Sequence, residues 1–423
     1  MAEIIPFKGV LYNPEKVDAG AVTAPPYDIV SPKAKDDLYR KSPHNIIRID
    51  FGKDNDGDDE NENRYSRASA LLNEWLKKDI LHQDSEPAFY CYESAYRVDG
   101  EERRLRGIIG AVKIEELGSG RIHPHEETHS KPKSDRLNIL RFCRANISPI
   151  FSIYSSAEKK TSSILEKVVK NKPFIEAIDS DGFINRLWKI SDQESIDAIR
   201  KEFSDKDIFI ADGHHRYETA LAFKHEMEQK GESKTGDEPF NYVLMFLANM
   251  DEPGLTLLPT HRMVEINSSI NITEVLRHCF DIEAFSYSND SEEKAAMDKM
   301  FYAMKTKQYS IGMFDKDEKK YYDLSFRCPH DSLDSHDILK KLDVTVLHKL
   351  IFREMLKVTN YEYEMSPEAA VERVKNSPAR AAFFLSPTRV EDLKAVALEG
   401  QRMPPKSTYF FPKLLTGMVI FKF

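Results

Sequence analysis

Apolar residues recur along this chain in two patterns, short continuous runs and longer segments with helical spacing. One of the runs, residues 208–211, stops at Asp212 and Gly213, and a segment with helical spacing starts directly after them. A short apolar run followed by an amphipathic segment predicts a strand that turns at once into a helix. This strand, turn and helix contain the first candidate site of the chain.

Two hairpins are predicted in the first half of the chain. Asp99 and Gly100 lie between two alternating segments, and Asp-Gly in that setting is a strong hairpin signal. A second turn at residues 180–182 separates residues 173–178 from 183–190. The other predicted strands are 45–51, 148–154, 242–250 and 417–423, and the predicted helices are 64–80, 135–144, 161–169, 193–203, 272–279, 292–305, 336–356, 367–375 and 389–399.

The first sixty residues hold few periodic segments, but predicted helices and strands follow them, so residues 1–265 are expected to form a mixed α/β catalytic region that includes the predicted turn. After about residue 265 the pattern changes to smaller α+β elements. Residues 266–423 are therefore expected to form a smaller C-terminal region packed on the first. The boundary is soft, because no linker composition marks it. The expected fold class is α/β, with mixed α+β character.

The composition is typical of a water-soluble globular protein, with 41% hydrophobic and 31% charged residues among 423. The net charge of -9 argues against a nucleic-acid partner bound through bulk charge. The first residues lack the basic and apolar regions of a signal peptide, and no apolar stretch approaches the ~20 residues that span a bilayer. We therefore expect a cytoplasmic protein without a membrane partner.

The four cysteines are scattered, and no C-x-x-C pair exists. Neither a zinc knuckle nor a thioredoxin-type redox site is therefore indicated. Free buried thiols in a reducing compartment are the simplest interpretation. The cysteines are Cys91, Cys143, Cys279 and Cys328.

The predicted turn carries an unusual density of functional groups. One carboxylate, two imidazoles and a guanidinium lie between Asp212 and Arg216, in the order Asp212, Gly213, His214, His215 and Arg216. The first N–H groups of a helix have no partners within the helix, and the helix dipole is positive at this end. Together with Arg216 they make a site for phosphate or another anion. The alternative is an ordinary strand, turn and helix with solvated charges.

A second polar cluster occupies residues 123–129. His125, Glu126 and His129 match the H-E-x-x-H pattern of zinc hydrolases, which requires both histidines on one face of a regular helix. Pro124 precedes the H-E-x-x-H segment, Pro132 follows it, and the segment has almost no apolar residue, so such a helix would be marginal. Three interpretations stay open: a zinc site, a solvated loop, or a catalytic loop in which Glu126 or Glu127 is a carboxylate base.

Further basic and polar side chains lie at predicted loops and helix ends. Arg262 follows an apolar strand, and Lys406 follows two prolines that fix the path of their loop, so both are candidates for phosphate contacts. A surface position without function is the alternative for each. The secondary candidates for substrate contact are Tyr27, Asp28, His125, Lys133, Arg136, Asn146 and His261.

A carboxylate on one loop and a basic anion site on another are what phosphorylation of a hydroxyl group requires. The carboxylate takes or orients the hydroxyl proton, while basic side chains and helix N–H groups hold the transferred phosphoryl group. The chain contains no G-x-x-x-x-G-K-[ST], no G-x-G-x-x-G and no kinase H-R-D motif. A phosphotransferase of the P-loop or protein-kinase type is therefore not indicated.

Six segments together resemble the widespread prokaryotic family called domain of unknown function 1015. They extend from near the first residues to the end of the chain, so the resemblance covers almost all of it. The family name implies no activity. The segments are APPYD at 24–28, PHEET at 124–128, DRL at 135–137, ADGHHRYETA at 211–220, LPTHR at 258–262 and MPPKSTYF at 403–410.

The turn carries a second, partial resemblance. Residues 212–216 look like the phosphate-binding turn of the ParB/sulfiredoxin-like fold, in which free-serine kinases pair a similar turn with a catalytic glutamate on an earlier loop. The resemblance assigns phosphate binding to residues 213–216 and places the glutamate at Glu126, with Glu127 as the alternative. It also implies a ParB/sulfiredoxin-like core with large N-terminal and C-terminal additions.

These implications lead to the hypothesis of a phosphotransferase. It would use Mg²⁺ with ADP or ATP and a small hydroxylated metabolite, free serine being the first candidate. Asp212 would orient the histidines or help to hold Mg²⁺, and Arg262 and Lys406 would close the site. Two alternatives are a nucleotide-binding regulatory module without turnover and a metal-dependent hydrolase that uses the H-E-x-x-H segment.

Overall fold

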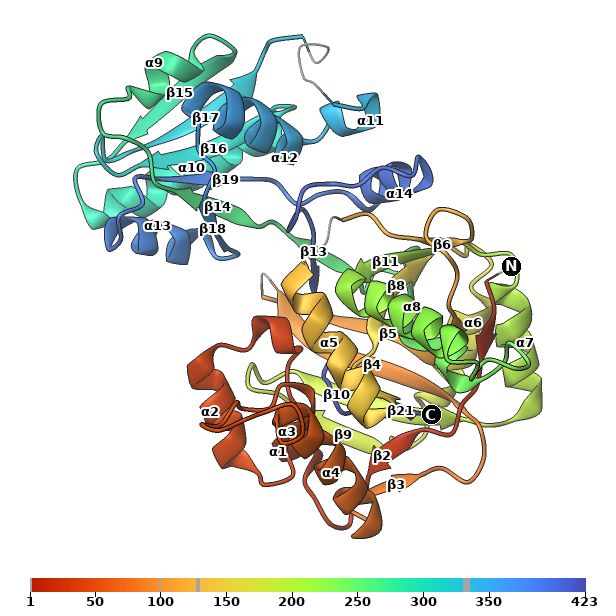
Figure 1. Ribbon diagram of the computed structural model, residues 1–423. Helices are drawn as coiled ribbons and strands as arrows, with labels where there is room; N and C mark the ends of the chain where they lie inside the picture. Colours follow the sequence, from red (N-terminus) through yellow and green to blue (C-terminus); the bar gives the residue numbers. More distant parts are fainter. Residues whose placement is uncertain (1, 99, 127–129, 330–334) are drawn as a thin grey trace. The chain divides into compact units, whose positions relative to one another are not determined.

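The computed structural model describes residues 2–98, 100–126, 130–329 and 335–423, and the chain divides into two compact units. Unit 1 contains residues 1–124, 128–256 and 412–423, and unit 2 contains residues 125–127 and 257–411. The chain therefore leaves unit 1 twice and returns to it each time (Figure 1). Both segments of unit 2 are thus inserted into unit 1.

In the described part of unit 1, nine strands form a mixed sheet. β11 is parallel to β6 and β12 is parallel to β8, while the other neighbours are antiparallel. β1 (Ile4–Ile5) pairs with β5 beside the main path. Along that path the strands follow the order β6 (Ile122–His123), β11 (Ile208–Asp212), β8 (Ile150–Tyr154), β12 (Tyr242–Asn249), β5 (Glu101–Lys113), β4 (Phe89–Val98), β10 (Ile184–Ile190) and β9 (Ile175–Ile178).

Two small strand pairs and a set of helices complete unit 1. β2 (Val10–Tyr12) pairs with β3 (Leu81–Gln83), and β7 (Ala145–Asn146) pairs with β21 (Phe421–Lys422) near the end of the chain. Two of the helices, α5 (Ser130–Cys143) and α8 (His214–Gln229), pack side by side (Figure 1). The other helices are α1 (Ala19–Val22), η1 (Tyr27–Ile29), α2 (Pro32–Lys41), α3 (Ile47–Asp50), α4 (Arg64–Lys77), α6 (Lys160–Val168), α7 (Gln193–Phe203) and η2 (Pro239–Asn241).

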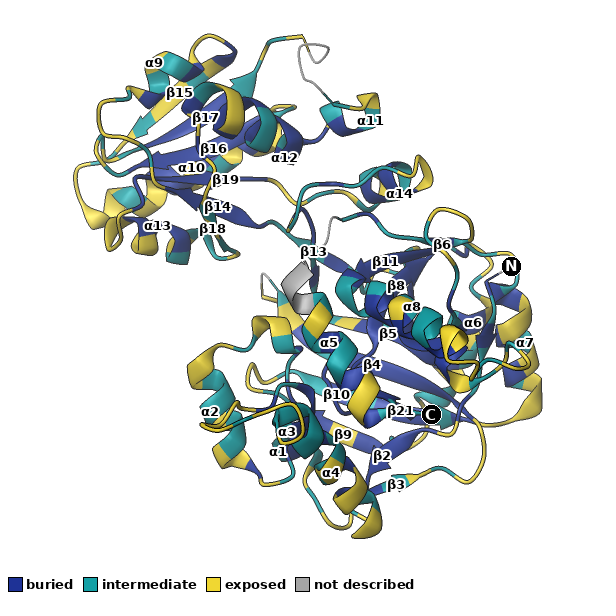
Figure 2. Cartoon of the chain, viewed as in Figure 1, coloured by how far each residue is buried: buried dark blue, intermediate teal, exposed yellow. Residues whose placement is uncertain are grey.

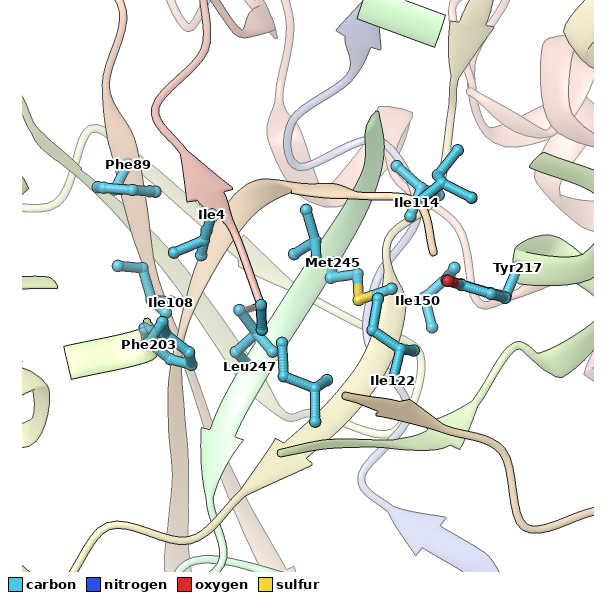
Figure 3. Close-up of a cluster of buried hydrophobic side chains, with 14 of the residues drawn as sticks. Ile4, Phe89, Ile108, Ile114, Ile122, Ile150, Phe203, Tyr217, Met245 and Leu247 are labelled. Carbon is cyan, nitrogen blue, oxygen red and sulfur yellow. The ribbon is translucent and has the colours of Figure 1, made fainter. Parts of the chain in front are cut away.

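The largest hydrophobic cluster of unit 1 forms around its central strands. β8 and β12 are buried along their whole lengths, as continuous apolar runs predict for strands covered on both faces (Figure 2). Figure 3 shows side chains of the cluster, among them Ile108 of β5, Ile150 of β8 and Met245 of β12. Tyr217 of α8 joins them, and its hydroxyl donates a hydrogen bond of 2.7 Å to the carbonyl of Glu115. This packing anchors the first turns of α8.

In the part of unit 2 that the structure describes, six strands form an antiparallel sheet. Met297, Met300 and Met304 of α10 pack with Phe314 and Phe384 in its core. The strands follow the order β15 (Phe280–Ser286), β17 (Lys320–Phe326), β16 (Ser310–Asp315), β19 (Ala381–Phe384), β14 (His261–Val264) and β18 (Tyr361–Glu364), and the unit also contains β13 (Thr256–Leu258, at its entry), β20 (Tyr409–Phe411), α9 (Ile272–Leu276), α10 (Asp290–Thr306), α11 (Asp337–Lys340), α12 (Asp343–Thr345), η4 (Val346–Leu356), α13 (Pro367–Lys375) and α14 (Val390–Leu398).

Most of the predicted elements are present. The two hairpins are confirmed as β4–β5 and β9–β10, with Gly100 at a φ of 80° in the first turn. Asp99 lies outside the described residues. The strand, turn and helix around Asp212 are confirmed as β11 and α8, and the mixed α/β fold class is confirmed. Among the helices that the structure describes, none has the length and apolar character needed to cross a membrane.

Two predicted elements are wrong. Residues 45–51, predicted as a strand, instead contain the short helix α3 at Ile47–Asp50, because the Asn45 side chain accepts a hydrogen bond of 3.0 Å from the N–H of Ile47. An Asn side chain bonded to the backbone two residues later favours a turn over an extended strand. Residues 336–356, predicted as one helix, are divided into α11, α12 and η4. Leu342 has an extended backbone between the first two and interrupts the helix.

The expectation of four free thiols is wrong for two of the cysteines. Cys279 and Cys328 form a disulfide, with their Cα atoms 5.0 Å apart and a sequence separation of 49. The wide spacing gave no signal, because only the pairing of β15 with β17 brings the two cysteines together. Cys91 and Cys143 are free and buried, as expected, and burial raises the pKa of both thiols.

Candidate functional site

The turn at Asp212 lies at the carboxyl end of β11, directly before α8. Gly213 precedes the helix with a φ of +97°, a left-handed conformation that glycine adopts readily and other residues rarely adopt. A Cβ atom at this position would lie 2.8 Å from Nε of Arg216. The turn therefore needs glycine for two reasons, the backbone angle and the close approach of the Arg216 side chain.

Two cations contact the carboxylate of Asp212. Nη2 of Arg216 donates to Oδ2 at 3.0 Å, and Nζ of Lys413 lies 3.2 Å from Oδ1. Nη1 of Arg216 also donates to the carbonyl of Pro149, just before β8. The three charged side chains are between 11% and 20% exposed, so solvent screens them less than it would on an open surface. Two cations against one carboxylate thus lie at the positive end of the α8 dipole.

The two histidines of the turn have different surroundings. His214 is buried, with 5% of its surface exposed, whereas His215 is half-buried and its carbonyl accepts a hydrogen bond of 2.6 Å from Thr219. One turn further along α8, Glu218 forms an ion pair with Lys133 of α5. Lys133, predicted as a secondary contact, therefore lies beside the first turns of α8.

A second, more deeply buried charged network connects α5 with α3. Nη1 of Arg136 donates to Oδ1 of Asp50 at 2.7 Å, and its Nε donates to Oδ2 of Asp135 at 2.9 Å. The guanidinium lies 3.9 Å from the centre of the Tyr27 ring. Burial raises the pKa of the Asp50 carboxyl, against the opposing effect of Arg136 and Arg216, and burial raises the pKa of Tyr27 to about 12. The network fixes η1, α3 and α5 together within unit 1.

A small cavity adjoins both the network and the turn. Its volume is about 40 Å³, which suffices for a few water-sized groups, because one water needs about 10–15 Å³. Arg136 and Arg216 both line it. The other polar lining residues are Asp50, Asn146, Ser148 and Thr219, and the apolar ones are Ile139, Leu140, Ala145, Ile147, Ile150 and Val243.

Glu126 belongs to unit 2, where it meets the loop that contains Ser407. Its Oε1 accepts a hydrogen bond of 2.9 Å from the N–H of Ser407, and its backbone forms a parallel bridge with Met403. The neighbouring His125 is fully buried, and its Nε2 lies 2.9 Å from Oγ1 of Thr408. The predicted base is therefore held at both backbone and side chain by one loop of its own unit.

The extended backbone at Glu126 bears on the zinc hypothesis. That motif needs His125 and Glu126 on a regular helix, whereas the helix of this region, α5, begins only at Ser130. The other predicted members of the site, Glu127 and His129, lie outside the described residues. Among the residues that are described, no three or more His, Cys, Asp or Glu side chains gather in a way that could hold a metal ion.

Arg262 is a buried cation of unit 2 with an exposed fraction of 1%. Its Nη2 donates to the carbonyl of Lys406 at 2.9 Å, and its Nε donates to Nε2 of His348 at 3.1 Å. Burial lowers the pKa of Arg262 to about 10 and that of His348 to about 3, so His348 is a neutral acceptor. Lys406 itself has a φ of 59°, a left-handed conformation uncommon for a residue with a side chain.

His261 lies in the interior of unit 2. Its Nδ1 accepts a hydrogen bond of 3.4 Å from the N–H of Leu385, and its ring centre is 5.1 Å from that of Phe384. Burial lowers the pKa of His261 to about 3, so the ring is neutral near pH 7. These surroundings are those of a histidine packed in a core.

The predicted site residues fall into two groups, one in each unit. Asp28, next to Tyr27, is exposed. Unit 1 holds Tyr27, Asp28, Lys133, Arg136, Asn146, Asp212, Gly213, His214, His215 and Arg216, and unit 2 holds His125, Glu126, His261, Arg262 and Lys406.

Three charged residues beside the turn or its neighbouring network were missed by sequence reasoning. Asp50 lies within residues 45–51, which the sequence predicts as a strand, and this prediction does not reveal its position at the end of α3. Asp135 lies within one of the family motifs, and that motif was the one signal for it. Lys413 reaches Asp212 only through the tertiary fold, and no local pattern points to it.

The fold and the turn define a mixed α/β protein with a glycine-capped, cation-rich strand, turn and helix. A protein-family profile described as "Protein of unknown function (DUF1015)" matches residues 4–345. The chain therefore belongs to the DUF1015 family, as its six motifs predicted. No curated protein matches it.

Several solved structures resemble the chain at low identity. Free serine kinase in complex with AMP has a TM-score of 0.34 and 11% identity, covering 70% of this chain and 89% of its own. A conserved hypothetical protein from Pyrococcus furiosus has a TM-score of 0.33 and 12% identity, covering 69% and 87%. SbnI with a C-terminal truncation, from Staphylococcus aureus, has a TM-score of 0.34 and 10% identity, covering 73% and 85%.

Proposed function

We propose that unit 1 binds the phosphate groups of a nucleotide at residues 212–216, and that the protein is a small-molecule phosphotransferase. Its acceptor would be a hydroxylated metabolite, with free serine as the first candidate. The observation that carries the proposal is the arrangement of Gly213, Arg216 and Lys413 at the start of α8. The proposal for this chain rests on these residues.

The electrostatics of the turn favour an anion with several oxygen atoms. Arg216 and Lys413 both contact the carboxylate of Asp212, and the positive end of the α8 dipole lies beside these two cations. The guanidinium of Arg216 offers several N–H donors in one plane, the geometry that suits phosphate oxygens. The missing side chain at Gly213 allows an anion to approach the helix start closely. A nucleotide phosphate meets all of these conditions.

Mg²⁺ fits the turn only in part. Asp212 supplies the oxygen ligands that Mg²⁺ prefers, but both of its oxygens contact cations. Proteins commonly bind Mg²⁺ through one or two carboxylates together with substrate phosphates. Asp212 would therefore hold the ion jointly with a bound nucleotide, where Mg²⁺ would offset the negative charge of the phosphates.

The role of Glu126 as the base stays a prediction. Its Oε1 accepts the N–H of Ser407, a contact that would hold the carboxylate in one orientation. A general base must come within hydrogen-bond reach of the hydroxyl whose proton it takes. The loss of activity in Glu126→Gln, with folding intact, would support that role.

One experiment separates transfer from binding alone. The full chain is incubated with Mg²⁺, ATP or ADP and a panel of hydroxy amino acids, and phosphorylated products are measured by mass spectrometry. The phosphotransferase proposal predicts a product with at least one acceptor. Nucleotide binding by calorimetry without any product would instead establish the regulatory module.

A pair of variants tests the site itself. Arg216→Ala removes a charged donor, and a charge-assisted hydrogen bond contributes about 1.5–3 kcal/mol, so we expect ADP affinity to fall by about 10-fold to 100-fold. Arg141→Ala is the control, because Arg141 of α5 also pairs with a carboxylate of α8, Glu226 at 2.9 Å, but its side chain is 45% exposed. This variant should leave ADP affinity unchanged. Equal affinities in Arg216→Ala and the parent chain would exclude the turn as the nucleotide site.

A further inference from the structure

The cavity between the turn and the Asp50–Arg136 network contains buried polar atoms without partners. Oδ2 of Asp50 and Nδ2 of Asn146 have no hydrogen-bond partner among the described residues. Both side chains line the cavity, and they are 2% and 8% exposed. Buried polar groups in folded proteins are nearly always paired, so each unpaired group needs an explanation.

The hydrogen-bond roles of these two groups follow from their other contacts. Oδ1 of Asp50 accepts a hydrogen bond from Arg136 at 2.7 Å, so Oδ2 is left as an unpaired acceptor on a residue that lines the cavity. Oδ1 of Asn146 accepts the N–H of Leu244 at 3.1 Å, which identifies the other terminal atom as the NH₂ group. Nδ2 is therefore a donor. The hydroxyl of Ser148, which also lines the cavity, can donate or accept.

An unpaired acceptor and an unpaired donor on two residues that line one small cavity can both be satisfied by a single group that donates and accepts. A hydroxyl donates its hydrogen to a carboxylate oxygen and accepts from an amide N–H. The volume of about 40 Å³ admits such a group and excludes a nucleotide base. The apolar lining residues would surround a short carbon stem.

We propose that this cavity is a subsite for the hydroxyl end of a small alcohol, with Asp50 Oδ2 accepting the hydroxyl hydrogen and Asn146 Nδ2 donating to its oxygen. Arg216 lines the same cavity from the turn. The subsite deepens the proposed function, because it assigns the place of the acceptor hydroxyl, and in that respect it rests on the phosphotransferase proposal. Burial of Asp50 raises the pKa of its carboxyl, and the cations Arg136 and Arg216 oppose that shift, so they favour the charged acceptor.

The test uses pairs of probes that differ by one hydroxyl group. L-serine and L-alanine form one pair, and glycolate and acetate form another. Calorimetric titration of the full chain should show at least tenfold tighter binding of the hydroxylated member in at least one pair. Equal affinities within both pairs would overturn the proposal and leave water as the partner of Asp50 and Asn146.

Three variants locate the effect. Asp50→Asn should abolish the preference for the hydroxylated probe. Because Asp50 is bonded to Arg136 and its loss can impair folding, Ser148→Val serves as a second variant, which fills part of the cavity and removes a hydroxyl. Ser94→Ala is the control, since Ser94 is buried in β4, lacks a partner among the described residues and does not line the cavity. A preference that persists in Ser148→Val and in folded Asp50→Asn would contradict the assignment.

A fourth variant separates this inference from the proposed function. Lys413 contacts Asp212 but does not line the cavity. Lys413→Met should therefore weaken ADP binding and leave the hydroxyl preference intact, whereas Ser148→Val should do the reverse. If ADP fails to bind at all while the hydroxyl preference exists, the proposed function is wrong and the subsite stands.

Discussion

Glu126 and Arg262 hold the two ends of the same peptide group. Arg262 Nη2 donates to the carbonyl of Lys406 at 2.9 Å, and the N–H of Ser407 donates to Glu126 Oε1 at 2.9 Å. The peptide between Lys406 and Ser407 thus lies between a cation at its oxygen and a carboxylate at its nitrogen. Both charges reinforce the dipole of that peptide, and they stabilise the left-handed backbone of Lys406.

Glu126 is therefore expected to contribute to stability apart from any chemistry. Glu126→Ala leaves the N–H of Ser407 without its acceptor and should lower the free energy of unfolding by about 1–2 kcal/mol. Glu126→Gln keeps an oxygen acceptor and should cost less than half as much. Urea unfolding measures both, with exposed Glu265→Ala as a control expected within about 0.5 kcal/mol of the parent. Equal losses in the Ala and Gln variants would argue against this hydrogen bond.

Gly213→Ala tests the geometry of the turn. The new Cβ combines a φ of +97° with a contact of 2.8 Å to Arg216, so the free energy of unfolding should fall by about 1–3 kcal/mol. Gly231, beyond the other end of α8, has a φ of +72° and open space around a Cβ. Gly231→Ala should therefore cost only about 1 kcal/mol. Denaturant unfolding measures the free energy of unfolding of both variants. An equal loss at the two glycines would show that contact with Arg216 adds nothing to the cost at Gly213.

The Asp343 carboxyl predicts a pH dependence. Burial, with a smaller contribution from Asp392, raises its pKa to about 7, above the unfolded value of about 3.9. A raised pKa means that the folded chain binds the proton more tightly, so this stabilisation is complete below about pH 4 and is lost as pH rises through 7. Relative to Asp343→Asn, the parent chain should lose about 1–3 kcal/mol across that window.

An exposed aspartate of the same unit provides the opposite control. The hydrogen bond from Lys340 lowers the pKa of Asp337. Its stabilisation is present above the unfolded pKa and is lost as pH falls through the folded value. Unfolding midpoints measured from pH 2 to 8.5 should therefore change in opposite directions for Asp343→Asn and Asp337→Asn, each measured against the parent. The change for Asp343→Asn should fall between about pH 4 and 7, and the change for Asp337→Asn only below about pH 4. The same direction in both would refute the assignment at Asp343.

The disulfide of unit 2 should contribute measurably to stability. Closing a loop of 49 residues restricts the unfolded chain and stabilises the folded one by about 2–4 kcal/mol. The double variant Cys279→Ser, Cys328→Ser should lower the free energy of unfolding of the oxidised protein by that amount, and its thermal midpoint should fall accordingly. Dithiothreitol should lower the midpoint of the parent to the same value and leave the double variant unchanged. A midpoint of the parent that is insensitive to reduction would contradict the pairing.

Local patterns were sufficient for the elements around the turn. The apolar run before Asp212 and the helical spacing after it identified β11 and α8, and Asp-Gly identified the first hairpin. Both signals come from residues that are neighbours in sequence, so they can be recognised without knowledge of the tertiary fold. The strand predicted at residues 45–51 failed for the opposite reason, because the Asn45 side chain bonds its own backbone and competes with an extended conformation.

The composition of the site depended on contacts that no local pattern contains. Lys413 meets Asp212, and Cys279 meets Cys328, only after strands distant in sequence have paired. Asp50 was hidden in a misassigned segment, although it is the carboxylate that shares a cavity with Arg216. Motif reasoning selected Glu126 instead, which belongs to unit 2.

The nested order of the two units has a consequence for synthesis. Residues 412–423 supply Lys413, which contacts Asp212, and β21, which pairs with β7, yet they leave the ribosome after all of unit 2. Unit 1 therefore cannot complete its fold during translation until the inserted unit has been made. Unit 2, whose main segment is continuous, can fold first, and its early folding would shorten the span that residues 412–423 must cross to reach unit 1.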